Sequence, residues 1–272
     1  MFNTPPRPHS ASRTQHGHDD EVLSWNQKGE FVAIGSTSYV EHLPNGIIIK
    51  TAWSGGDRAQ QRRREIATEA EIYDRLGEHP CLVKKMAWDP DEHTLTLEDM
   101  PDGTLKDYLE SYADVPLEQR KKWATEAVEC AQLLHSSGVI HCDIGPHNFL
   151  LDNRLRLKII DFSGSSVDGS RTEISPGTRY AAPTLGRSLQ WTATVKADLF
   201  ILGSTIYCIM TGKPPFEEFQ SEDVQKMYSN QEFPDLADIP HADLIRGCWS
   251  QDFESVDRLV PLLNVEQRIE TV

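Results

Sequence analysis

The arrangement of three oxygen-bearing side chains constrains this sequence more than any other feature. Asn148 follows Asp143 by five residues, and Asp161 comes thirteen residues after Asn148. Gly145-Pro146 excludes a regular helix between the first two, which therefore lie on a loop. Residues 156–160 predict a short strand that carries Asp161 to a second loop. The sequence thus predicts a hairpin that places an asparagine and a carboxylate at the same end. Two side chains placed in this way can bind one metal ion.

These residue types fit phosphoryl transfer, which needs a carboxylate beside the attacking hydroxyl and oxygen ligands for the metal ion that bridges the phosphates. Asp143 supplies the carboxylate, and Asn148 and Asp161 supply the ligands. Either half alone is also typical of ordinary turns, because Asp and Asn commonly cap turns. A hairpin with ordinary turn residues is therefore the alternative interpretation. It explains less well why the loop with Asp143 and Asn148 and the strand leading to Asp161 occur together.

Composition limits the classes of partner. The formal net charge is −15, from 27 basic and 42 acidic side chains. Nucleic acid and anionic membrane surfaces both need a basic footprint on the protein, so neither is expected as the main partner. The longest apolar run, 199–210, is about half the length that a membrane span requires, and it predicts a buried helix instead.

Cysteine usage and the N-terminal segment bear on the compartment. The five cysteines are widely spaced and contain no C-x-x-C pair, which favours a reducing compartment over a disulfide framework or a zinc site. Residues 1–20 are rich in Pro, Ser, His and Arg without an apolar core, so a disordered tail is expected and not a secretory signal. We expect a cytoplasmic location, with the nucleus as the alternative, and a monomer by default.

The hydrophobic periodicity predicts a β-rich front part and a helical rear part. Strands are predicted at 30–34 and 46–51, on either side of the turn signal Pro44-Asn45-Gly46. A helix is predicted at 62–76 and a further short strand at 94–97. Beyond these segments the chain is mostly helical, apart from one loop-rich block.

This order predicts an α+β fold with two unequal lobes and a cleft between them. The predicted parts are a disordered tail (1–20), a small β-rich N-lobe with its hinge (21–100) and a larger helical C-lobe (101–272). The Arg62-Arg63-Arg64 run at the start of the predicted helix is interpreted as a solvated face, with a phosphate site as the alternative.

The order of the motifs resembles one known family. H-x-D-x-x-x-x-N from His141, followed by D-F-x-G from Asp161, resembles the catalytic-loop and metal-loop signature of eukaryotic protein kinases. The resemblance implies the bilobal protein-kinase-like fold. It further implies that Asp143 orients or deprotonates a substrate hydroxyl, and that Asn148 and Asp161 hold Mg²⁺. His141 and Phe162 are expected to pack the site and not to act in catalysis.

The same resemblance implies a set of nucleotide-binding residues. Lys50 stands where the family places its phosphate-binding lysine on the third strand. Glu69 stands where the family places the glutamate that holds this lysine, and Glu71 is the competing candidate. The backbone of Glu98 and Met100 corresponds to the hinge that faces adenine.

Other segments extend the resemblance over about residues 30–250. Gly35 and Val40 bound the stretch that corresponds to the glycine-rich phosphate loop, and Leu97 corresponds to the gatekeeper. Tyr73 is expected to complete the packed column formed by the histidine and phenylalanine of the two signature motifs. Three later segments resemble the end of the activation segment, the buried helix that anchors the catalytic loop, and the loop after that helix: 179–183, 198–203 and 211–216.

Four departures from the family pattern carry expectations of their own. The loop from Gly35 keeps one glycine and is about two residues short, which weakens the expected grip on phosphate. Cys142 replaces an arginine that receives an activation-loop phosphate, so it is expected to be a structural thiol in a protein not regulated through that contact. Gly145 replaces a lysine that faces the transferred phosphate. Thr184 replaces a glutamate that forms a buried ion pair, and its arginine partner is absent from 248–253 as well.

The resemblance implies an ATP- and Mg²⁺-dependent phosphotransferase that acts on a protein hydroxyl, on Ser or Thr, with activity lowered by these departures. The substrate itself is unknown. The general pattern is similar to divergent kinase-like proteins of filamentous fungi. Two alternatives remain: a pseudokinase that binds nucleotide or acts as a scaffold without turnover, and a small-molecule phosphotransferase of the aminoglycoside-kinase type, which shares the H-x-D-x-x-x-x-N arrangement.

Overall fold

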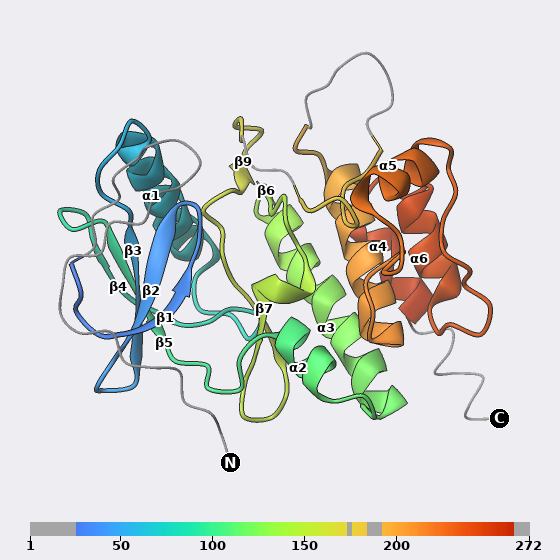
Figure 1. Ribbon diagram of the computed structural model, residues 1–272, viewed down its shortest axis with the longest axis horizontal. Coiled ribbons are helices and arrows are strands. Elements are labelled where there is room, and N and C mark those ends of the chain that lie inside the picture. The colour runs from blue at the N-terminus through green and yellow to red at the C-terminus, as the bar shows by residue number, and fades with distance from the viewer. Residues whose placement is uncertain (1–25, 173–175, 184–191, 264–272) are drawn as a thin grey trace. The chain divides into compact units, whose positions relative to one another are not determined.

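The computed structural model describes residues 26–172, 176–183 and 192–263 (Figure 1). The predicted disordered tail at 1–20 and the substituted position Thr184 lie outside the described residues. The described chain forms two compact units. The first comprises residues up to Ala67 together with Met86–Asp99, and the second comprises Thr68–Lys85 and the chain from Met100 onward.

The first unit is built on a five-stranded sheet with the order β1-β2-β3-β5-β4 (Figure 1). Its strands are β1 (Glu30–Ile34), β2 (Ser38–Leu43), β3 (Ile47–Ala52), β4 (Lys85–Asp89) and β5 (Thr94–Glu98). β1, β3 and β5 confirm the three predicted strands to within a residue. β2 and β4 were missed, because β2 begins inside the stretch interpreted as a phosphate loop and β4 is short and largely exposed.

The second unit is mainly helical and carries two short two-stranded sheets. Its elements are α2 (Leu105–Ser111), α3 (Leu117–Ser136), β6 (Val139–Ile140), η1 (Pro146–Asn148), β7 (Phe149–Leu151), β8 (Leu157–Ile159), β9 (Ser166–Val167), α4 (Val195–Thr211), α5 (Ser221–Ser229), α6 (Ala242–Trp249) and η2 (Val256–Arg258). β6 pairs with β9, and β7 pairs with β8. A β-rich smaller unit and a larger helical unit confirm the α+β class.

Helix α4 forms the core of the second unit and packs against α3 and α6. It confirms the buried helix predicted from the apolar run, since almost every residue from Ala197 to Met210 is buried. The helix begins at the N-cap Thr194, whose hydroxyl accepts the backbone N–H of Ala197, and ends at Gly212 in the left-handed conformation. Gly203 permits close approach to α6, because a Cβ there would lie 2.5 Å from the Cβ of Cys248.

Helix α1 (Ala59–Leu76) confirms the predicted helix and starts three residues earlier. The boundary between the two units falls within it, after Ala67. Its C-terminal half and the following segment belong to the second unit because they bond to it: the carbonyl of Cys81 accepts the N–H of Ile159, and Lys158 donates to the carbonyl of Leu82. The predicted lobe limits at 100 and 101 remain a prediction.

The structure bears on the exposure of the arginine run at 62–64 and on whether a helix could span a membrane. Arg62 is buried, with 4% of its surface exposed, so the interpretation of the arginine run as a solvated face is wrong for this residue, although Arg63 and Arg64 are exposed. The reason is local, because the Arg62 guanidinium donates to the carbonyls of Ser36 and Gly55. Within the described ranges, no helix combines the length and apolarity needed to cross a bilayer.

Candidate active site

The loop that carries Asp143 is fixed at its base by one buried carboxylate. Asp198, on α4, is 1% exposed and accepts the backbone N–H groups of His141 and Cys142 at 2.8 Å each. It also contacts Nε2 of His135, on α3, at 3.0 Å. One side chain of α4 therefore holds two successive amides of the loop. This explains why the loop keeps one conformation although it lies outside any regular element.

A second contact from α4 holds the middle of the loop. The Thr205 hydroxyl donates to the carbonyl of Ile144 at 2.8 Å, and both groups are buried. Asp198 and Thr205 are seven residues apart on the helix, about two turns, and so lie on the same face of α4. Side chains of α4 therefore hydrogen-bond the loop on both sides of Asp143.

His141 joins this loop to the strand that delivers Asp161. Its Nδ1 accepts the N–H of Asp143 at 3.2 Å, so the proton of the neutral ring is on Nε2, which donates to the carbonyl of Ile160 at 3.0 Å. The predicted packed column is confirmed. The Phe162 ring contacts His141 at a centroid distance of 5.5 Å and Tyr73 at 5.1 Å, both edge to face.

The two oxygens of the Asp143 carboxylate have different surroundings. Oδ2 contacts Nε2 of His147 at 3.0 Å and accepts Nδ2 of Asn148 at 3.2 Å. Oδ1 is buried and has no hydrogen-bond partner among the described residues. An unpartnered carboxylate oxygen is costly to keep, on the order of 1–3 kcal/mol. Its persistence fits an oxygen reserved for a substrate group.

Asn148 and Asp161 lie at the same end of the β7–β8 hairpin, as predicted. Phe149 pairs with Ile159, and the carbonyl of Asn148 accepts the N–H of Ile160 at 3.0 Å. This register places the residue before β7 beside the residues that follow β8. Asp161 adopts φ +66°, a conformation that costs energy for a residue with a side chain and that is typical of functional sites.

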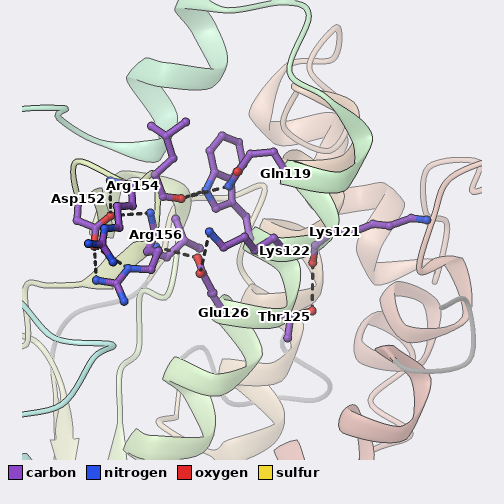
Figure 2. Close-up of polar contacts among 11 residues, drawn as sticks. Gln119, Lys121, Lys122, Thr125, Glu126, Asp152, Arg154 and Arg156 are labelled. Atoms are coloured by element: carbon purple, nitrogen blue, oxygen red, sulfur yellow. Dashed lines mark hydrogen bonds and ion pairs between the residues drawn. The ribbon is translucent and has the colours of Figure 1, made fainter.

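The far end of the hairpin is tied to α3, as Figure 2 shows. Asp152 accepts the N–H groups of Arg154 and Arg156 at 2.8 and 3.0 Å and the Arg156 side chain at 2.8 Å. Although burial opposes it, this bonding lowers the pKa of Asp152. Glu126, on α3, accepts the N–H of Leu157 at 2.9 Å. Because the turn is anchored, the ligand end of the hairpin has a defined orientation.

The oxygens at the open end of the hairpin suit a hard divalent cation. Nδ2 of Asn148 donates to the carbonyl and carboxylate of Asp143, which leaves Oδ1 of Asn148 as its ligand atom. The Asp161 carboxylate accepts the Ser163 hydroxyl through Oδ1 at 2.8 Å and is the second candidate ligand. Mg²⁺ is held by one or two such protein oxygens together with water and substrate phosphates. Among the described residues, no group of three or more His, Cys, Asp and Glu side chains is placed so that it could hold a metal ion.

The predicted nucleotide-binding residues of the first unit share one face of the sheet. Val40 on β2 lies directly opposite Lys50 on β3, and Leu97 on β5 lies opposite Ile48, two residues before the lysine. Cross-strand partners and residues two apart project from the same face. Lys50 is 7% exposed and lies on the third strand, as expected.

The choice between the two glutamates of α1 is supported by burial. Glu69 is 1% exposed, whereas Glu71 is exposed. A buried carboxylate in a protein needs a partner, and an exposed one does not. The burial of Glu69 agrees with its choice over Glu71, and its pairing with Lys50 stays a prediction. The hinge residue Glu98 is the last residue of β5 and Met100 comes two residues later, and their contact with adenine stays a prediction.

The shortened phosphate loop is tied down by its own unit. Trp53 donates Nε1 to the carbonyl of Gly35 at 3.0 Å and its backbone N–H to the carbonyl of Thr37 at 3.1 Å. Arg62 donates to the carbonyl of Ser36 between them at 3.3 Å. Three successive carbonyls are thus engaged, which restricts the loop to one path between β1 and β2.

Cys142 is a structural residue, as expected. Its side chain is fully buried, its backbone has φ +74°, and its Sγ lies 3.3 Å from the carbonyl of Ile140. Burial, with a contribution from the negative charge of Asp198, raises the pKa of this thiol far above its ordinary value. A thiol that resists ionisation is a poor redox nucleophile. All five cysteines are free and buried.

Comparison with known proteins agrees with this geometry. The family model described as protein kinase domain matches residues 42–260. The chain belongs to the protein kinase domain family. The match includes the catalytic loop, the hairpin and α4, and it begins on β2, after the shortened loop.

Individual relatives of this kinase domain are distant. Human receptor-interacting serine/threonine-protein kinase 1 is 26% identical over 247 residues, covering 81% of this chain and 37% of the relative. Arabidopsis thaliana mitogen-activated protein kinase kinase kinase 3 is 26% identical over 238 residues, covering 80% and 35%. Serine/threonine-protein kinase RUNKEL, also from Arabidopsis thaliana, is 34% identical over 164 residues, covering 58% and 12%. The chain thus spans little more than a third, or less, of the length of these relatives.

One pair that sequence reasoning missed ties α1 to the start of the segment after the metal loop. Both terminal nitrogens of Arg75 bond the carboxylate of Asp168, at 2.9 and 2.8 Å, and Arg75 also donates to the carbonyl of Ser137 at 3.0 Å. Hydrogen bonds from this guanidinium lower the pKa of Asp168. The two residues are 93 positions apart in the sequence, so no local sequence pattern predicts their contact. Within the second unit of the kinase domain, this bidentate pair links a helix to β9.

A second missed residue, His147, carries a signal that could have been read. It stands four residues after Asp143 and directly before Asn148, so it lies inside the signature motif. The family pattern relates Gly145 only to the missing lysine and does not connect it with the histidine two residues later. The structure brings the two together beside the carboxylate.

Proposed function

We propose that this kinase domain transfers the γ-phosphoryl group of ATP to a hydroxyl of a protein, on Ser or Thr. The observation that carries the proposal is the Asp143 carboxylate, which is held through Oδ2 by His147 and Asn148 and whose Oδ1 has no hydrogen-bond partner among the described residues. The relatives named as serine/threonine-protein kinases support the class of acceptor.

Each residue has a role in this proposal. Asp143 orients the acceptor hydroxyl and takes its proton. Asn148, through Oδ1, and the carboxylate of Asp161 would hold Mg²⁺, which would neutralise charge on the phosphates when bound. Lys50, positioned by Glu69, binds the phosphates of the nucleotide, and the sheet face around Val40 covers its base. The protein acceptor and the cytoplasmic or nuclear setting remain part of the proposal.

The test is a transfer assay with purified protein, γ-labelled ATP and a mixture of acceptor proteins. We expect label on Ser or Thr, found by phosphoamino acid analysis, and loss of at least 100-fold when Mg²⁺ is chelated or Asp161 is changed to Asn, since the metal supplies several kcal/mol of charge stabilisation. Label on an aminoglycoside and not on protein would replace this proposal with the small-molecule alternative.

A second candidate, a pseudokinase, is favoured by one observation. The carbonyls of Gly35, Ser36 and Thr37 are tied to Trp53 and Arg62, and the loop is poor in glycine, so its amides are less free to close on a phosphate. A thermal shift with ATP and Mg²⁺ separates the two candidates when combined with the transfer assay. A shift without any transfer would establish the pseudokinase.

We expect activity to be independent of phosphorylation at Thr172. Its hydroxyl already donates to the carbonyl of Gly164 at 2.7 Å, and no arginine follows His141 to receive a phosphate. Farther along, Arg179 is held by the carbonyl of Phe219 at 2.5 Å and by the Tyr228 hydroxyl at 3.0 Å, so this stretch is anchored without phosphate.

Thr172→Ala should therefore keep kcat within about threefold, since the hydrogen bond to Gly164 that it loses is a neutral one. Thr172→Glu should not raise kcat. The measurement is the transfer rate of protein made without kinase exposure. Loss of activity in the alanine variant together with its recovery in the glutamate variant would contradict this expectation. The other residue considered for such regulation, Ser175, lies outside the described residues.

A further inference from the structure

Among the described residues, two side chains contact the carboxylate of Asp143 through a nitrogen atom. One is Asn148, and the other is His147. Its Nε2 lies 3.0 Å from Oδ2 of Asp143. An ionised carboxylate can only accept, so Nε2 carries the proton and donates it. The side chain of His147 is 43% exposed.

The space that the imidazole occupies is available because residue 145 is glycine. A Cβ on Gly145 would lie 2.6 Å from Cε1 and 2.8 Å from Nδ1 of the His147 ring. These distances are far below van der Waals contact, so any side chain at position 145 would displace the ring. Gly145 and His147 are therefore matched.

The glycine is not needed for the shape of the backbone. Gly145 has φ −92° and ψ 166°, an extended conformation that residues with side chains adopt freely. Its N–H and carbonyl bond the carbonyl of Asp143 and the N–H of Asn148, and these backbone bonds are open to any residue except proline. What the glycine contributes is room for the ring.

We propose that His147 is the positioning residue for Asp143, and that Gly145 is present to admit its imidazole. This rests on the proposed function for its effect on turnover. The donation from Nε2 adds to that of Asn148, and together they fix the orientation of the carboxylate that acts on the acceptor hydroxyl.

A double-mutant cycle on turnover tests the matching. His147→Ala should lower kcat by roughly 10- to 100-fold, the range for groups that orient a functional ligand, with the KM for ATP little changed. Gly145→Ala should lower kcat similarly, because its Cβ displaces the ring. The double variant should lose no more than either single one. His147→Gln, whose amide nitrogen has a similar reach, should retain most of the rate.

Two controls accompany the cycle. Gly177→Ala places a Cβ where nothing lies within 4 Å and should leave kcat unchanged. Thermal unfolding should show that Gly145→Ala keeps the midpoint of the wild type, because a half-exposed ring can rotate away. Unchanged kcat in His147→Ala, or additive losses in the double variant, would overturn the proposal.

A readout without turnover separates this inference from the proposed function. Nitrogen-15 NMR of the histidine rings, with His147 assigned from its absence in His147→Gln, should show a protonated Nε2. That signal should shift in Asp143→Asn and also in Gly145→Ala. If the wild type transfers no phosphate, the proposed function fails, and the ring signals alone decide the positioning. Signals unmoved by both substitutions would overturn it.

Discussion

Asp198→Ala should produce the largest loss of stability of any single substitution at the site. The carboxylate is buried on α4 and accepts the N–H groups of His141 and Cys142, and it contacts His135. Alanine leaves two amides and an imidazole nitrogen buried without an acceptor. We expect the free energy of unfolding to fall by about 3–5 kcal/mol. That is a large part of the total for a typical domain, which is about 5–15 kcal/mol.

The measurement is urea unfolding followed by tryptophan fluorescence. Asp198→Asn keeps one oxygen acceptor and should lose less than the alanine variant. The control is Glu254→Ala, which removes the exposed partner of Lys196 on the same helix, an ion pair of 2.7 Å. Because surface pairs contribute little, its unfolding free energy should change by less than about 1 kcal/mol. A loss in Asp198→Ala no larger than in this control would show that the loop does not depend on α4.

Asp143→Asn should produce the largest loss of activity with the fold intact. The amide oxygen can take the place of Oδ2 and accept from His147 and Asn148, which puts the amide nitrogen at the position of Oδ1. The neutral amide cannot take a proton from an acceptor hydroxyl. We expect kcat to fall by roughly 10²- to 10⁴-fold, the usual contribution of a general base.

The matched control is Asp223→Asn, in which an exposed carboxylate on α5 loses its ion pair with Lys226. Its kcat and its thermal midpoint should equal those of the wild type. The thermal midpoint of Asp143→Asn should also be unchanged, which separates lost chemistry from lost folding. Transfer that survives Asp143→Asn at near the wild-type rate would sink the proposed role of this residue.

Much of the fold followed from local pattern. The apolar run of α4 and the alternation of β3 and β5 predicted these elements to within a few residues, because periodic burial is written directly into neighbouring positions. β4 was missed because its five residues are short and mostly exposed, so they carry little periodicity. The burial of Arg62 was missed because its partners lie on a turn 26 residues earlier and on another close by.

The sequence by itself determined the oxygen-bearing set of Asp143, Asn148 and Asp161. Their placement depends on one hairpin of adjacent strands, whose geometry is local. Only the tertiary structure revealed that Asp198 holds the loop from 56 and 57 residues away, and that the Gly145 backbone leaves room for the His147 ring. Contacts across such separations depend on how helices and loops pack, and a glycine's lack of a side chain acquires meaning only when its neighbour in space is known.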